Sequence, residues 1–168
     1  MRIHIVRHGE AEPASQEVSD GERKLTAEGR RQSQLLGSAL SVLDNIPTLI
    51  LTSPLRRALE TTEIAVRAMT TTNRRPPIRV LDRLSPEFRT DDLLSALPIE
   101  STSLMLIGHQ PTLGELAGIL IGGIHARPLP LSTGSVACLE TIQTPSPGVA
   151  HLEYFLRQNI ISFLARIP

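Results

Sequence analysis

The chain has 168 residues, a formal net charge of zero at pH 7, a single cysteine and no tryptophan. These values exclude the long-range field of a polyanion binder, the stacked aromatic residues of a single-strand binder and an internal disulfide framework. No apolar run approaches the roughly 20 residues of a membrane span, and the N-terminus is too charged for a signal peptide. We therefore expect one cytoplasmic domain over residues 1–168 that binds neither nucleic acid nor a membrane.

Short apolar runs alternate with helical patterns along the first two-thirds of the chain. Strands are predicted at residues 2–7, 48–52, 78–81 and 103–107, and helices ending near residues 43, 69, 97 and 121. Thr26 is the expected cap of the first helix, and Ser53-Pro54 is the expected start of the second, because serine caps well and proline fits the first turn. Residues 9–24 are polar and rich in turn formers, and they predict a loop.

The last third of the chain changes pattern. Residues 135–140 and 150–157 alternate in polarity across a proline-rich turn, and they predict a hairpin. The final ten residues are compatible with a helix or with a packing tail. Together these elements predict an α/β fold, a three-layer α/β/α sandwich whose mostly parallel central sheet has an antiparallel edge. No pattern indicates an oligomeric state.

Basic side chains follow three of the predicted strands. Arg7 and His8 end the first strand, Arg57 lies at the start of the helix after the second, and His109 ends the fourth. Ligands of open α/β sheets bind beyond the carboxyl ends of the strands, so neighbouring strands would bring these four side chains together. Each has an ordinary structural interpretation when taken alone, but two arginines and two histidines at one point suit a tetrahedral dianion.

Three segments in this order and spacing resemble the histidine phosphatase superfamily, which is also called the phosphoglycerate mutase-like family. They are Arg7-His8-Gly9, Ser53-Pro-Leu-Arg-Arg57-Ala-Leu-Glu-Thr61 and Gly108-His109. The shortness of the chain, the Leu25-Thr26-Ala-Glu-Gly29 segment and the sequence GHQPTL further resemble SixA-type phosphohistidine phosphatases. The resemblance implies a phosphoglycerate mutase-like fold and a phosphatase that works through a phosphohistidine intermediate.

The resemblance also implies a role for each basic residue. His8 would be the nucleophile, while Arg7, Arg57 and His109 would bind the phosphate, with Arg56 as a surface neighbour of Arg57. A neutral imidazole suits the first role, because its ordinary pKa of about 6.5 leaves the free base available and nearby guanidinium groups lower that pKa. A cationic His109 is expected to stabilise the transferring group. No metal-ligand spacing is present, and neither a metal nor a cofactor is expected.

The general acid is less clearly marked. Glu87, between Arg57 and His109, is the candidate, although it could equally be an exposed loop carboxylate, and Asp91 or Asp92 could simply cap a short helix. A phosphohistidine substrate needs less acid assistance than an ester, since imidazole is a far less basic leaving group than an alkoxide.

Three functions are compatible with these residues and their spacing. The first is dephosphorylation of phosphohistidine in a signalling or phosphotransfer protein, such as a histidine phosphotransfer domain. The resemblance implies it, and the length of the chain favours it as well, because only 51 residues separate Arg57 from His109, which leaves no large insertion to act as a lid and suits a bulky substrate. The second is hydrolysis of a small phosphomonoester, such as a sugar or nucleotide phosphate, which a functional Glu87 would favour. The third is a non-catalytic phosphate-binding module, which would not need the nucleophile.

Overall fold

A six-stranded sheet forms the centre of the computed structural model, which describes residues 1–69 and 75–167. Part of the polar stretch that follows the second predicted helix, residues 70–74, lies outside the described residues. The strands are β1 (Arg2–Arg7), β2 (Leu49–Thr52), β3 (Ile78–Val80), β4 (Ser103–Gly108), β5 (Val136–Glu140) and β6 (His151–Leu156). The helices are α1 (Ala27–Val42), α2 (Arg56–Ala68), α3 (Thr90–Ser95), α4 (Thr112–Gly122) and α5 (Gln158–Leu164), with short 3-10 helices η1 (Asp20–Glu22) and η2 (Asp82–Leu84).

The strand order is β3-β2-β4-β1-β5-β6. The first four strands are mutually parallel, whereas β5 runs antiparallel to both β1 and β6. The predicted parallel sheet with an antiparallel edge is therefore confirmed. The order also places β4 between β1 and β2, so the three strands that precede the basic residues are direct neighbours.

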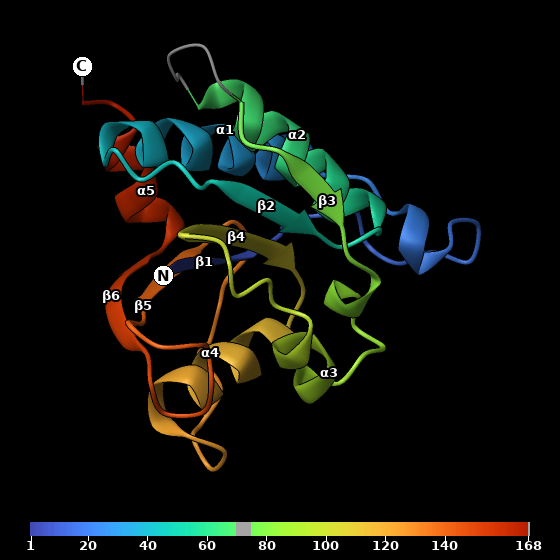
Figure 1. The fold of residues 1–168 in the computed structure, drawn as a ribbon. Helices are drawn as coiled ribbons and strands as arrows, with labels where there is room; N and C mark the ends of the chain where they lie inside the picture. The colour runs from blue at the N-terminus through green and yellow to red at the C-terminus, as the bar shows by residue number, and fades with distance from the viewer. Residues whose placement is uncertain (70–74, 168) are drawn as a thin grey trace.

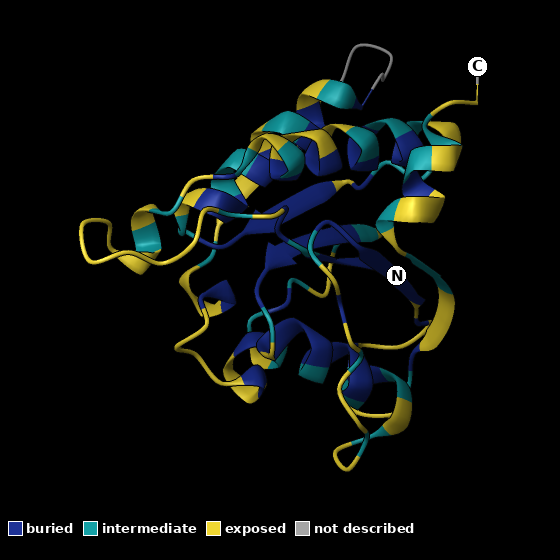
Figure 2. Ribbon diagram, turned by 180° about the vertical axis from the view of Figure 1, so that it is seen from behind, coloured by how far each residue is buried: buried dark blue, intermediate teal, exposed yellow. Residues whose placement is uncertain are grey.

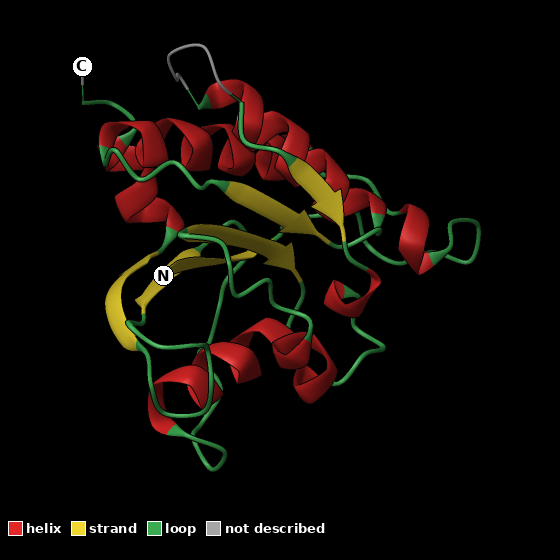
Figure 3. Ribbon diagram, viewed as in Figure 1, coloured by secondary structure: helices red, strands yellow, loops and turns green. Residues whose placement is uncertain are grey.

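Helices cover both faces of the sheet, as Figure 1 and Figure 3 show, with α1, α2 and α5 on one side and α3 and α4 on the other. Each layer packs its own apolar cluster against the strands. Leu36 and Leu40 of α1 pack with Ile50 and Ile107 on the first face. The four inner strands β1, β2, β4 and β5 are almost entirely buried, whereas β3 and β6 at the two sides of the sheet and the outer faces of the helices are largely exposed (Figure 2). Two buried faces explain why the inner strands are continuous apolar runs instead of alternating ones.

Element boundaries agree closely with the predicted ones except at α2 and the C-terminus. Thr26 caps α1 as expected, since its side chain accepts a hydrogen bond from the Gly29 N–H. The second helix begins at Arg56 and not at Ser53-Pro54. The reason is that the Ser53 N–H donates to the Ile107 carbonyl over 2.9 Å and so continues the sheet. The C-terminal segment, left open by its sequence, forms α5.

No helix in residues 1–69 and 75–167 is both long and apolar enough to span a membrane.

Candidate active site

The candidate site lies where β1, β4 and β2 end side by side. The His8 N–H donates to the Gly108 carbonyl over 3.0 Å, which ties the residue after β1 to the end of β4. Gly108 directly precedes His109, and Ser53 directly follows β2. Parallel strands bring their carboxyl ends to one edge, so the alternation of strand and helix in the sequence is what assembles the site.

His8 has a defined tautomer. Its Nδ1 lies 2.6 Å from the Gly9 carbonyl, which can only accept, so Nδ1 carries the proton. Its Nε2 therefore carries the ring's lone pair, which accepts a hydrogen bond from Arg57 Nε over 3.2 Å. This is the tautomer expected for a nucleophilic imidazole, with the proton held on one nitrogen by the backbone and the lone pair on the other, where an incoming phosphorus would replace the Arg57 hydrogen bond.

The charge state of His8 follows from its surroundings. Burial lowers the pKa of His8 to about 4, and the nearby guanidinium groups of Arg57, Arg7 and Arg23 lower it as well, against the opposing effect of the Gly9 carbonyl. Burial of an imidazole disfavours its charged form because the ion loses its hydration. The ring is thus neutral, and nucleophilic in form, at physiological pH.

Arg57 is almost completely buried, and each of its three guanidinium nitrogens donates a hydrogen bond. In addition to its bond to His8, its Nη1 donates to the Asp20 carbonyl over 2.6 Å and its Nη2 to the Asp20 carboxylate over 3.0 Å. Asp20 also accepts from Arg23 Nη1 over 2.7 Å. The carboxylate therefore bridges two guanidinium groups at the rim of the site, and the Arg23 hydrogen bond is the largest of the influences that lower its pKa.

Two glycines bring the loop after β1 against the first turn of α1. A Cβ atom at Gly9 would overlap the Gly29 carbonyl, and a Cβ atom at Gly29 would overlap the Glu10 carbonyl. The Gly9 N–H donates to Thr61 Oγ1 over 3.0 Å, and the Thr61 hydroxyl donates to the Arg57 carbonyl over 2.7 Å. The backbone beside His8 is thereby fixed to both α1 and α2.

His109 faces His8, with ring centroids 4.9 Å apart and ring planes tilted by 55°. Its Nε2 lies 2.8 Å from Ser53 Oγ, while its Nδ1 is buried and has no hydrogen-bond partner among the described residues. Burial, followed by the proximity of His8 and Arg57, lowers the pKa of His109 to about 3. The expectation of a cationic His109 therefore does not hold for the free protein, in which the ring is neutral.

Arg7 completes the group. Its Nη1 donates to the Leu131 carbonyl over 2.9 Å, and its buried Nε has no partner within the described part of the chain. Its positive charge contributes to the lowered pKa values of both His8 and His109, so it lies on their side of the sheet edge. The structure thus brings together all four basic residues that the sequence singled out.

Other candidate residues lie outside this group. Arg56 is exposed and pairs with Glu60 and Glu22, which agrees with its assignment as a surface neighbour of Arg57. Glu87 lies on an exposed turn after η2 and makes no hydrogen bond or ion pair to any described residue. Asp91 and Asp92 are exposed in the first turn of α3, and neither side chain caps the helix.

Sequence reasoning missed the contributions of Asp20, Arg23 and Ser53. Asp20 and Arg23 belong to the polar segment 9–24, where charged residues in a turn-rich stretch have the pattern of a solvated loop. Ser53 was within a recognised motif but was interpreted as a helix cap. Only the three-dimensional proximity of these side chains to Arg57 and His109 indicates a role.

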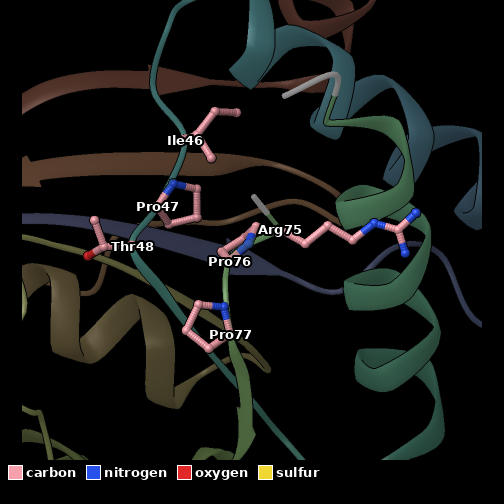
Figure 4. Close-up of a pocket in the computed structure, with 6 residues that line it drawn as sticks. All are labelled: Ile46, Pro47, Thr48, Arg75, Pro76 and Pro77. Carbon is pink, nitrogen blue, oxygen red and sulfur yellow. The ribbon is translucent and has the colours of Figure 1, made fainter. Parts of the chain in front are cut away.

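The geometry suits an anion and offers no evident metal site. Among residues 1–69 and 75–167, no cluster of three or more histidine, cysteine or acidic side chains could hold a metal ion. A separate hollow, lined by Ile46, Pro47, Thr48, Arg75, Pro76 and Pro77, is shown in Figure 4. Its residues precede β2 and β3, so it lies at the amino ends of the parallel strands. His8 lies at their carboxyl ends, and the hollow is no part of this site.

Comparison with known proteins agrees with this description. Residues 3–85 match the family model of the histidine phosphatase superfamily, branch 1. An uncharacterized protein of Picosynechococcus sp. is 32% identical over 145 residues, which cover 84% of this chain and 86% of that one. The chain belongs to the histidine phosphatase superfamily, and it is a phosphatase that uses a histidine mechanism.

Solved structures show the same fold. The protein histidine phosphatase SixA complexed with tungstate superposes with a TM-score of 0.79 at 24% identity, over 96% of this chain and 99% of that one. A putative phosphohistidine phosphatase SixA from Agrobacterium tumefaciens gives 0.74 at 25% identity, over 93% and 97% of the two chains. A putative alpha-ribazole-5'-P phosphatase from Escherichia coli gives 0.61 at 19%, over 94% and 98%. The phosphoglycerate mutase-like fold is confirmed.

Proposed function

We propose that this phosphatase removes the phosphoryl group from phosphohistidine in a signalling or phosphotransfer protein, with His8 as its nucleophile. The observation that carries the proposal is the state of His8. Its Nδ1–H is held by the Gly9 carbonyl, and the Nε2 lone pair points at Arg57 in the free protein. The ring is neutral at physiological pH, so it is ready to attack an electrophilic phosphorus.

The reaction has two steps. His8 Nε2 forms a bond to phosphorus while the bond between phosphorus and the substrate imidazole breaks, and the released imidazole takes a proton from solvent. Water then attacks the phosphoryl group on His8, which releases inorganic phosphate and restores the free base. Arg7, Arg57 and His109 hold the phosphoryl oxygens in both steps, because their N–H groups face the charge that develops there.

The leaving group favours phosphohistidine over an ester. Imidazole leaves without a strong acid, whereas an alkoxide needs one. Glu87, the candidate acid, is exposed and without a partner among the described residues. The structural likeness to two SixA proteins supports the same substrate class. Cys138 is a free, buried thiol, which fits the reducing cytoplasm where we expect the protein to act.

A small phosphomonoester is the second candidate. The observation in its favour is that Glu87 comes three residues after Leu84, whose carbonyl lies beside Gly108 at the edge of the site. A carboxyl group on this turn is the kind of acid that an alkoxide leaving group requires.

The test compares substrates and traps the intermediate. Initial rates are measured on a 32P-labelled histidine phosphotransfer domain and on a panel of sugar and nucleotide monoesters. We expect higher kcat/KM on the phosphoprotein, and a preference for esters of a thousandfold or more would overturn the first assignment. Label transferred to this chain is then resolved by size after an alkaline quench, which preserves phosphohistidine.

His8→Ala should abolish that label and lower the rate at least a thousandfold, because it removes the nucleophile that the proposal assigns. The matched control is His125→Ala, which removes an exposed histidine outside the group. Label that persists in His8→Ala would exclude His8 as the nucleophile.

A further inference from the structure

Ser53 occupies an unusual position for the first residue after a strand. It is completely buried, its backbone extends the sheet, and its hydroxyl lies 2.8 Å from His109 Nε2. The Leu55 N–H points at the same hydroxyl oxygen over 3.3 Å. Ser53 Oγ therefore has one donor already directed at it and a single proton of its own to place.

We propose that Ser53 is a positioning residue that donates its hydroxyl proton to His109 Nε2 and thereby holds the proton of the neutral ring on Nδ1. In this tautomer the Nδ1–H is a donor for an oxygen of the transferring phosphoryl group. The inference rests on the proposed function for its consequence in catalysis, but the tautomer itself is a property of the free protein.

Counting hydrogen bonds decides between the two tautomers. With the proton on Nδ1, the Ser53 hydroxyl donates to Nε2 and accepts from Leu55, which leaves only the Nδ1–H unpartnered among the described residues. With the proton on Nε2, the ring donates to Ser53, and both the serine proton and the bare Nδ1 lack partners. Each unsatisfied buried polar group destabilises the fold, so the first tautomer, which leaves one fewer, is favoured.

The charged and titratable groups around His109 agree with a neutral ring. They are the His8 ring, the guanidinium groups of Arg57 and Arg7, and the carboxylate of Asp20. Two positive charges and one negative charge disfavour a further proton on His109. A neutral ring has only one N–H, so its placement decides whether His109 donates to an anion or presents a lone pair to it.

The tautomer of His109 decides whether the ring attracts or repels a phosphoryl oxygen. A phosphoryl oxygen near Nδ1 would gain a hydrogen bond in the tautomer that Ser53 selects, and it would meet a repulsive lone pair in the other. The buried and unpartnered Nδ1 is thus a prepared donor, which gains its acceptor only when the anion arrives.

The direct test is 15N NMR of histidine-labelled protein without ligand, in which a protonated ring nitrogen and a bare one have distinct shifts. We expect His109 to be almost entirely Nδ1–H in the wild type, while the exposed His125 and His151 report the free equilibrium as internal references. A His109 ring that is protonated on Nε2 in the wild type would overturn the proposal, whatever the activity.

Variants connect the tautomer to turnover. Ser53→Ala should mix the two tautomers of His109 and slow phosphoenzyme formation about five- to tenfold, and Ser53→Thr, which keeps the hydroxyl, should restore both. Thr52→Val is the matched control, since it removes a neighbouring buried hydroxyl that bonds Thr62 and the Ser53 carbonyl but neither His109 nor the Ser53 hydroxyl. We expect it to leave the His109 spectrum unchanged.

The two proposals fail separately. If the wild type shows no phosphohistidine hydrolysis but has the Nδ1–H tautomer, the substrate assignment is wrong and the role of Ser53 in the fold stands. If Ser53→Ala loses activity while the His109 tautomer stays the same, Ser53 acts only structurally and the inference is wrong.

Discussion

The two sides of the site differ in how far their polar groups are satisfied before any ligand arrives. On the Arg57 side, formed by His8, Arg57, Asp20 and Thr61, each of these side chains has a hydrogen-bond partner within the protein. On the His109 side, formed by Arg7 and His109, two buried nitrogens have no partner among the described residues.

This difference shows which hydrogen-bond donors of the free protein are available to a ligand. Buried donors without partners are rare in native structures because each one costs stability. Arg7 Nε and His109 Nδ1 are therefore the donors that an oxyanion would satisfy first, while the Arg57 side already holds the nucleophile in place. The following experiments test this division of roles.

The largest effect is expected from a substitution on the Arg57 side. Arg57→Lys should lower kcat/KM about 100- to 1000-fold, because a lysine cannot reproduce the guanidinium geometry that bonds His8 Nε2, the Asp20 carbonyl and the Asp20 carboxylate at once. Arg56→Lys is the matched control on the adjacent, exposed position, where steady-state rates should stay within about twofold. Equal losses in the two variants would mean that Arg57 contributes only positive charge to this face.

The His109 side should contribute most of the affinity for a free oxyanion. Inorganic phosphate at 100 times its Kd should stabilise the wild type by about 2.7 kcal/mol, or about 5–10 °C in Tm. Arg7→Gln should weaken phosphate binding about 10- to 100-fold, because a charge-assisted hydrogen bond to the anion is lost.

Arg2→Gln, at the other end of β1, controls for the loss of a positive charge, and thermal denaturation with and without phosphate measures both variants. A full phosphate-induced shift in Arg7→Gln would place the anion elsewhere.

Asp20 offers a smaller effect of opposite sign. Asp20→Asn keeps an oxygen for Arg57 Nη2 but removes a negative charge from the rim, and we expect inorganic phosphate to inhibit about 1.4- to 5-fold more strongly. The range follows from the about 0.2–1 kcal/mol typical of a partly exposed ion pair. Glu22→Gln, on the same short helix but paired with Arg56, is the control. Weaker inhibition in Asp20→Asn would show that its charge is needed to orient Arg57.

The pH dependence should be weak where an ordinary histidine would give a strong one. Because the pKa of His8 is lowered to about 4, the ring loses its nucleophilic form only near that pH and stays neutral above it. Single-turnover phosphoenzyme formation should fall less than twofold from pH 7 to pH 5, whereas a pKa of about 6.5 would give about a 25-fold loss. NMR titration of His8 near pH 6.5 would contradict this expectation.

Glu87 should have the smallest effect. Glu87→Gln should leave phosphohistidine hydrolysis within about twofold, because the imidazole leaving group needs little acid assistance. Asp92→Asn, another exposed carboxylate beyond the site, is the comparison. A tenfold or greater loss on monoesters alone would assign Glu87 as the acid and favour the second candidate function.

The sequence predicted the parts of the site that sit at the ends of regular elements. His8, Arg57 and His109 follow strands whose apolar runs are unmistakable, and the parallel sheet then forces them to one edge. The antiparallel hairpin of β5 and β6, which forms one lateral side of the sheet, was equally visible, because alternation in two runs across a turn has few other interpretations.

The parts that could not be predicted depend on contacts between distant loops. Asp20 lies 37 positions from Arg57, in a segment whose polarity is that of any solvated loop. The start of α2 was misplaced because Ser53, which looked like a cap, continues the sheet through the hydrogen bond from its N–H to the Ile107 carbonyl. The neutral state of His109 in the free protein could not be predicted, because burial, which no local pattern reveals, lowers its pKa.

The close approach of Gly9 and Gly29 has a consequence for how this enzyme can vary. Neither residue carries a functional group, yet any larger residue at position 29 must push against the backbone of the loop after β1. That displacement would move the imidazole of His8 away from Arg57 without touching a single reactive atom. Tolerance to substitution should therefore be low at Gly29, a position on the first helix that a search for reactive side chains would pass over.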